Sequence, residues 1–173
     1  MKSSSLVRLL CAACLAFASA VTYAATPPPD NVSVHYKDPK NFTEAKLSAG
    51  INQLNADDYL KPLKEYIAQR ASRILTSGQH LDIEVTDVDR AGDFEPWHGP
   101  RMDQVRVIKS IYPPRIDLNF TLTDADGKVL SKGQRKLRDL AFMDDSSPAL
   151  DSDSLRYEKG LIDRWLRKGV DKL

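Results

Sequence analysis

Apolar and polar residues alternate in several stretches of the chain, as they do in a strand that buries one face. The clearest stretch is 116–123, where every second residue from Ile116 to Leu122 is apolar and the residues between them are polar. Three shorter stretches show the same period of two, and the one at 105–108 is the briefest. The pattern predicts strands at 32–36, 81–86, 105–108 and 116–123.

A turn and a returning strand are expected after the clearest stretch. The segment Asp124–Gly127 has the composition of a tight turn, because aspartate bonds to nearby backbone and glycine adopts a positive φ without strain. A turn of this kind usually joins antiparallel neighbours. We therefore expect 128–140 to pair with 116–123.

Two segments have the three- and four-residue spacing of an amphipathic helix. The first begins at Asp57 or Asp58 and is expected to end at Ser77-Gly78, a stop signal. Its apolar stripe consists of Leu60, Leu63, Ile67, Ala71 and Ile74. The second is capped by Ser154 or a neighbour and carries Leu155, Ile162, Trp165 and Leu166 on one face. Between the first strand and the first helix, 40–55 has only weak periodicity and predicts a polar loop.

The order of these elements is strand, helix, several strands and a final helix. A strand–helix–strand unit favours parallel pairing of its two strands, whereas the later hairpin is antiparallel. We therefore predict an α+β fold: a two-layer sandwich in which two helices cover one face of a mixed, mainly antiparallel sheet.

The N-terminal segment has a different composition. Lys2 and Arg8 precede an apolar run, and Thr22-Tyr23-Ala24 places small residues where a signal peptidase cleaves. We therefore expect a signal peptide over 1–24, a Pro-rich linker over 25–31 and a single α+β domain over 32–173, located in the periplasm or secreted. Cys11 has the place where a lipoprotein signal needs a Leu-like residue, so Cys14 is not expected to carry a lipid.

Charge and cysteine content narrow the range of partners and chemical activities expected for this chain. The chain has 25 basic and 24 acidic residues, and removal of Lys2 and Arg8 leaves 23 against 24, a net charge of −1. This balance argues against nucleic acid as a partner. No second apolar run is long enough for a transmembrane segment. Both cysteines lie in the predicted signal peptide, so the mature chain has neither a disulfide nor a thiol nucleophile.

The segment from Asp87 to Gln104 holds the densest group of candidate functional residues. Carboxylates gather there, but their spacing is not that of an EF-hand, and we interpret them mainly as acceptors for backbone N–H groups and as partners of arginines. We expect Asp89 to be ionised and held by Arg106 or Arg115. Trp97 is either an exposed anchor for a partner or a cap on the sheet. The candidate binding residues are Asp87, Asp89, Trp97, Arg106, Arg115 and Tyr157.

An anion site is a second interpretation of the basic residues. Arginine suits bidentate binding of a carboxylate or phosphate. Such a site would draw on Arg106, Arg115, Arg138 and Lys159, with Tyr157 beside them. The competing interpretation is that neighbouring carboxylates neutralise these cations within the fold.

The function favoured by these residues is a non-catalytic binding or accessory module of the envelope, whose partner is a protein or a small ligand. No catalytic residue, metal ligand or cofactor motif is predicted, because the chain has no nucleophile elbow, zinc motif or phosphate loop. The alternative is a small periplasmic hydrolase or metal-dependent enzyme that uses Asp87, Asp89 and His98. A purely structural accessory domain is a third possibility.

Several segments together resemble a known family. They are Val34-His35-Tyr36-Lys37-Asp38-Pro39, Thr86-Asp87-Val88-Asp89, Ile111-Tyr112-Pro113-Pro114-Arg115 and Tyr157-Glu158-Lys159. This combination resembles the bacterial secreted proteins grouped as domain of unknown function 3016, over nearly the whole mature chain. Arg90 departs from the family, which usually has Leu after the second aspartate. The resemblance implies an envelope or secreted location and implies no activity.

Overall fold

The computed structural model describes residues 29–49, 55–99, 102–144 and 152–173. The predicted signal peptide, most of the linker and parts of the loops lie outside the described residues. Within these residues, the predicted α+β architecture is confirmed.

Four strands form the main sheet, in the order β1-β2-β5-β6. Their bounds are Val32–Tyr36 for β1, His80–Asp89 for β2, Arg115–Thr123 for β5 and Val129–Arg138 for β6. β1 runs parallel to β2, and the β2–β5 and β5–β6 pairs are antiparallel. The sheet is therefore mixed and mainly antiparallel, as the alternation of apolar and polar residues predicted.

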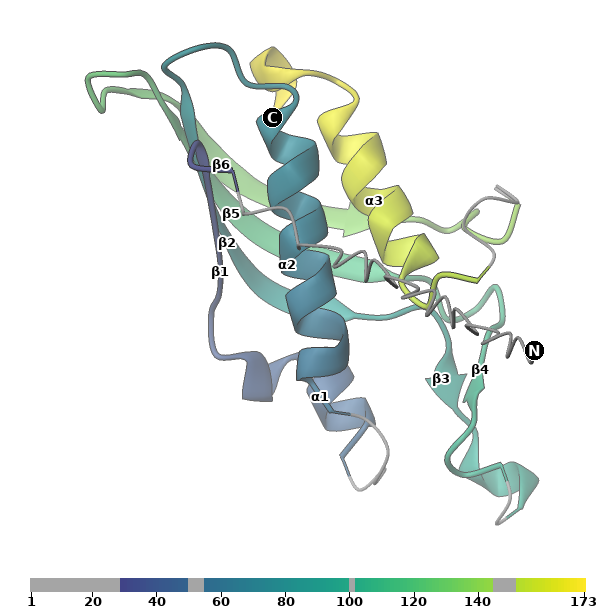
Figure 1. Cartoon of the computed structure of the whole chain (residues 1–173). Coiled ribbons are helices and arrows are strands. Elements are labelled where there is room, and N and C mark those ends of the chain that lie inside the picture. Colours follow the sequence, from purple (N-terminus) through teal and green to yellow (C-terminus); the bar gives the residue numbers. More distant parts are fainter. Residues whose placement is uncertain (1–28, 50–54, 100–101, 145–151) are drawn as a thin grey trace, which may run out of the picture.

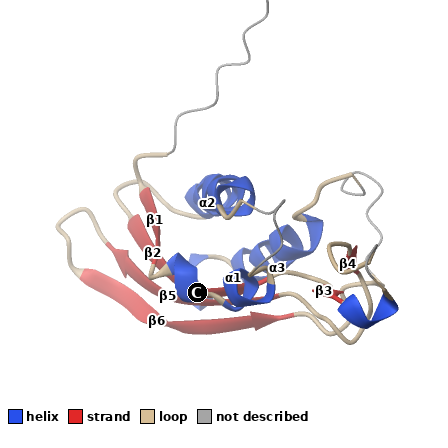
Figure 2. Cartoon of the chain, turned by 90° about the horizontal axis from the view of Figure 1, so that it is seen from below, coloured by secondary structure: helices blue, strands red, loops and turns tan. Residues whose placement is uncertain are grey.

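Two long helices, α2 (Asp57–Ser72) and α3 (Arg156–Leu166), lie side by side over one face of this sheet (Figures 1 and 2). Leu63 and Ile67 of the α2 stripe are fully buried, as are Ile83 and Ile116 of the sheet. The opposite face of the sheet is polar. One apolar core between the two layers thus holds the domain together. No helix among the described residues combines the length and apolarity that crossing a membrane requires.

The structure corrects the expectation of a polar loop after β1. A 3-10 turn, η1 (Pro39–Asn41), and a short helix, α1 (Thr43–Leu47), follow β1 directly. Phe42 between them is buried against the core and meets the ring of Tyr36 edge-on. A helix of five residues is too short to show a periodic pattern, so the sequence did not predict it.

The ends of two elements also differ from expectation. β2 continues past Thr86 to Asp89 after an irregularity between Val85 and Asp87, so the segment thought to be a loop begins as strand. α2 ends at Ser72, several residues before Gly78. Ahead of α3, by contrast, the expected acceptor is present: Asp153, the neighbour of Ser154, accepts the N–H of Leu155. Local capping and strand pairing decide these ends, and the hydrophobic pattern does not report them.

A second, two-stranded sheet projects from one end of the molecule (Figure 1). It consists of β3 (Asp93–Phe94) and β4 (Arg106–Val107), with the 3-10 turn η2 (Pro96–His98) between them. We call residues 93–107 the arm; 100 and 101 lie outside the described residues. The arm contains most of the predicted functional segment.

Candidate binding site

The carboxylates of the predicted functional segment are separated in the structure, each with its own partner. Asp87 caps α1: its Oδ1 accepts the N–H of Thr43 at 2.7 Å and its Oδ2 accepts the Thr43 hydroxyl at 2.7 Å. Asp93 accepts the N–H of Phe94. Asp87 and Asp93 thus hold backbone N–H groups at the start of α1 and in β3, which is the scaffold role that their sequence positions suggested.

Asp89 forms an ion pair with Arg115, directly opposite it on β5. The Arg115 Nε donates to Asp89 Oδ2 at 2.6 Å. Asp89 is buried, whereas about half of the Arg115 side chain is exposed. Burial raises the pKa of the Asp89 carboxyl, and the hydrogen bond from Arg115 opposes that rise. The expected contact with Arg115 is therefore confirmed.

Arg106 has a different partner from the ones we expected. It pairs with Glu44 of α1 and donates to the carbonyl oxygens of Ala91 and Gly92, while its guanidinium lies over the ring of Phe94. Glu44 is fully buried and also accepts the N–H of Arg90 at 3.2 Å. Burial raises the pKa of the Glu44 carboxyl, and Arg106 opposes that rise. Sequence reasoning missed Glu44 because it lies in the short helix that left no periodic signal.

Glu158, at the start of α3, is a third buried carboxylate at the base of the arm, after Asp89 and Glu44. Its Oε1 accepts the N–H of Ala91 at 2.7 Å, and its Oε2 has no hydrogen-bond partner among the described residues. The same residues offer no hydrogen-bond partner to the buried Tyr59 hydroxyl or to the buried Nε of Arg90. Burial raises the pKa of Glu158, and burial raises that of Tyr59 to about 12. These buried polar side chains therefore bring α1, α2, α3 and the end of β2 together at the base of the arm.

A cleft of about 470 Å³ opens beside these buried polar side chains, at the base of the arm. The Asp89–Arg115 pair lines it, together with Arg90 and Arg138. Its apolar lining includes Leu47, Ile111 and Leu140, which are 39%, 69% and 79% exposed. The cleft thus combines cationic groups with apolar side chains that no other described part of the protein covers.

The residues proposed for an anion site do not converge. Arg115 and Arg138 share the cleft, but Arg138 also pairs with Asp117 on β5. Tyr157 lines another pocket, between α2 and α3, where its ring meets that of Phe142. Lys159 donates to Asp153 at 2.5 Å. With Arg106 bound to Glu44, the structure places this set at several separate locations.

The arm is held together by a buried carboxylate. Glu95, 2% exposed, accepts hydrogen bonds from Lys109 on both oxygens at 2.7 Å and from the Tyr112 hydroxyl at 2.9 Å. His98 Nε2 lies 2.9 Å from Glu95 Oε2. Hydrogen bonds from Lys109 hold the pKa of Glu95 below its ordinary value. Glu95 therefore ties the first limb of the arm to the segment between β4 and β5.

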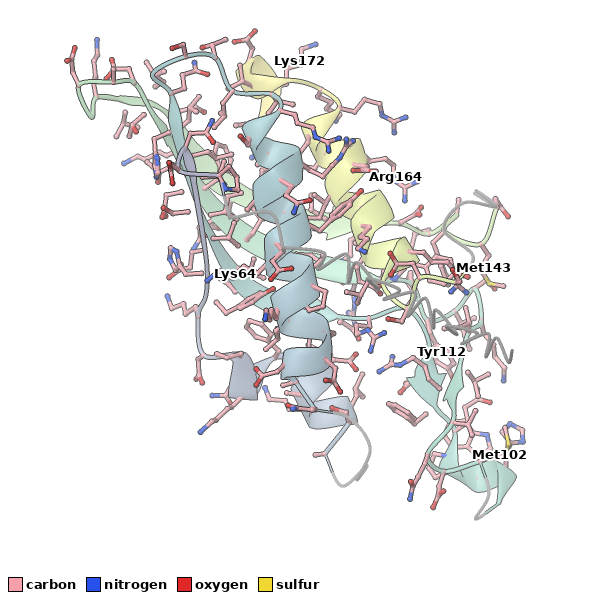
Figure 3. The ribbon with its side chains drawn as sticks, viewed as in Figure 1. Lys64, Met102, Tyr112, Met143, Arg164 and Lys172 are labelled. Atoms are coloured by element: carbon pink, nitrogen blue, oxygen red, sulfur yellow. The ribbon has the colours of Figure 1, made fainter. Side chains whose placement is uncertain are left out.

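Several apolar side chains of the arm are nevertheless exposed. Trp97 is 69% exposed, so the interpretation in which it caps the sheet is wrong. Met102 and Val105 are also exposed, and Figure 3 shows Met102 at the far end of the arm. His98 approaches only the Trp97 ring and Glu95 in the described residues. No three His, Cys, Asp or Glu side chains of the described residues lie close enough together to hold a metal ion.

Comparison with known proteins identifies the family. Residues 30–168 match a family described as "Protein of unknown function (DUF3016)". No curated protein and no solved structure matches the chain. The match covers most of the chain and includes the Tyr112-Pro113-Pro114-Arg115 segment on which the resemblance depended. The chain therefore belongs to the DUF3016 family of proteins of unknown function.

Proposed function

We propose that this protein is a non-catalytic binding module of the periplasm or the extracellular space, and that the arm docks on an apolar surface of a partner protein. The observation that carries the proposal is the exposure of Trp97 on an arm whose base is closely packed. A large aromatic side chain left in water costs hydrophobic free energy that burial against a partner recovers. Tryptophan on a projecting element is a frequent anchor of protein interfaces.

The packing at the base of the arm supports this role. Gly92 has φ +85, and a Cβ there would meet the carbonyl oxygen of Val107 at 2.7 Å. Its N–H donates to the carbonyl of Tyr112 at 3.0 Å. An arm held this closely loses little conformational entropy on binding, which favours affinity.

The neighbouring cleft extends the proposed surface. Ile111 lies in the segment that follows the arm and lines the cleft with a largely exposed side chain, so we include the cleft in the proposed surface. The hydrolase alternative has less support, because Asp87 and Asp89 are occupied by Thr43 and Arg115. Location outside the cytoplasm is part of the proposal and rests on the N-terminal sequence pattern.

Site-specific photo-crosslinking tests this function. A photoreactive amino acid replaces Trp97 in one variant and Gln69 in a control; Gln69 is exposed on α2, outside the arm. In cells that produce the protein, we expect one defined crosslinked partner from position 97 and none from 69. The purified partner should then bind the wild type at least about tenfold more tightly than Trp97→Ser, and its affinity for Gln69→Ser should equal that for the wild type.

Two results would contradict the proposal. Equal crosslinking from both positions would indicate contact without a specific surface. Equal affinity of the purified partner for the wild type and Trp97→Ser would show that the arm is not the anchor. Circular dichroism of each variant checks that folding is unaffected.

A further inference from the structure

A second surface, on the opposite side of the sheet from the β1 edge, has features of a peptide-binding groove. β6 is an edge strand: among the described residues it pairs with β5 alone. No backbone hydrogen bond from another described segment reaches its outer edge. The outward N–H and C=O groups of an edge strand are free to pair with another chain.

A groove of about 370 Å³ lies between this strand and α3. One wall consists of the four consecutive residues Arg135 to Arg138. Successive side chains of a strand point to opposite faces, so a groove that touches all four runs along the strand's edge. The other wall is the face of α3 that carries Leu161 and Trp165. The outer edge of β6 is thus accessible from the groove.

The rim of the groove is strongly basic. None of its lining residues is acidic. Figure 3 shows Arg164 on α3 and Lys172 near the end of the chain. Some of the cations have partners: Arg164 pairs with Asp139, Arg138 with Asp117, and Arg135 donates to the carbonyl of Leu173. Four others have no side-chain partner among the described residues: Lys136, Arg167, Lys168 and Lys172.

We propose that an extended acidic segment of another protein adds to β6 as a fifth strand and fills this groove. The backbone of the segment pairs with the edge of β6, and carboxylates on one face of the segment meet Lys136, which lies on the polar face of the sheet. Apolar side chains on the other face of the segment rest on the floor formed by Leu137, Leu161 and Trp165. Strand addition beside a helix derives affinity from main-chain hydrogen bonds and specificity from alternate side chains.

Charge and geometry together favour this occupant over a membrane surface or a free polyanion. Unpartnered lysines alone attract any anion, but only a peptide backbone uses the open edge of β6. The proposal does not depend on the arm, because its groove contains none of the arm residues.

A labelled peptide tests the proposal directly. The probe is a short fluorescein-labelled peptide in which Glu and Val alternate, titrated with the purified protein and followed by fluorescence anisotropy. Two further peptides of equal charge are N-methylated at every second residue, one in each register, so that one of them cannot pair with β6. We expect the unmodified peptide to bind and one methylated peptide to bind at least about tenfold more weakly.

Protein variants locate the site. Lys136→Glu should weaken binding of the unmodified peptide at least about tenfold, because an attractive contact with the carboxylates becomes repulsive. The control Lys128→Glu removes an exposed lysine of the β5–β6 turn, outside the groove, and should leave affinity nearly unchanged. Hydrogen exchange on the wild type should show new protection of β6 amides when the peptide is bound. This measurement does not depend on how well any variant folds.

Three results would overturn the proposal. Equal binding of both methylated peptides would mean that charge alone attracts the probe. An equal loss of peptide affinity in Lys128→Glu would mean that the peptide is attracted by the overall basic charge and has no defined site. Binding to vesicles that contain phosphatidylglycerol, with no binding of any peptide, would indicate an anionic lipid surface as the occupant.

Discussion

Single buried carboxylates determine how the base of the arm is held. Glu44, Asp89 and Glu158 are each nearly inaccessible to water, and each accepts hydrogen bonds from groups on other elements. A buried carboxylate is tolerated when donors surround it, and removal of its partner is costly. These residues therefore connect α1, β2, β5 and α3 at one point, and the arm extends from that point.

The raised pKa of Glu158 predicts the direction in which the stability of the fold changes with pH. Burial raises the pKa of this carboxyl above its unfolded value, although Arg90 attracts the charge. The folded protein then binds more protons than the unfolded chain between the two pKa values, so stability is greatest below the unfolded pKa and falls as pH rises through the folded one. Glu158→Gln removes this loss and keeps an oxygen for the Ala91 N–H.

We expect Glu158→Gln to raise the free energy of unfolding by about 1 kcal/mol at pH 8, with little difference from the wild type in mild acid. Urea melts over a pH series measure this difference. Glu158→Ala is the control: it leaves the Ala91 N–H without an acceptor and should destabilise by about 1–3 kcal/mol at every pH. A Gln variant that loses stability with rising pH in parallel with the wild type would refute the assignment.

Gly92 offers a second prediction at this scale. A methyl group there would be strained by φ +85 and would lie 2.5 Å from Cδ1 of Ile108 and 2.7 Å from the carbonyl oxygen of Val107. Gly127 has nearly the same dihedral angle, φ +79, but nothing within 4 Å. Gly92→Ala should therefore destabilise by about 2–4 kcal/mol and Gly127→Ala by about 1 kcal/mol. Thermal melts compare the two, and equal losses would show that crowding at Gly92 is unimportant.

The elements divide into those that the sequence predicted and those that it did not. Period-two alternation identified β5 because its apolar residues face one core and its polar residues face solvent. The apolar stripe of α2 was equally visible. In contrast, α1 and the arm are held by single contacts such as Asp87 to Thr43 and Glu95 to Lys109. Contacts between residues distant in sequence leave no periodic pattern, so the buried role of Glu44 could not be predicted.

The phase of α2 can be tested by shortening one core side chain. Ile67 is fully buried between α2 and the sheet, so Ile67→Ala leaves a cavity and should cost about 2–5 kcal/mol of stability. Gln69 is exposed on the other side of the same helix, and Gln69→Ala should change stability by less than about 0.5 kcal/mol. Urea melts of both variants measure the difference. A small loss for Ile67→Ala would mean that the helix faces the sheet with a different side.

For the whole molecule, charge is distributed unevenly even though the total is nearly balanced. The groove beside β6 gathers unpartnered lysines, whereas the outer face of β2 carries Asp82 and Glu84, near His35 of β1. A net charge close to zero therefore does not describe either surface. The balance still gives no support to nucleic acid as a partner, but it leaves room for local binding of an acidic segment.

The proposed export of the chain gives the last prediction. Thr22-Tyr23-Ala24 follows an apolar run, so we expect cleavage after Ala24 and a product that contains neither Cys11 nor Cys14. Intact mass of protein from the periplasm or the medium should match a chain that begins at Ala25, without lipid. Because such a chain has no cysteine, its melting temperature should not change when a reductant is added. A mature N-terminus at an acylated Cys14 would instead make this protein a lipoprotein, tethered to the membrane while its arm binds a partner.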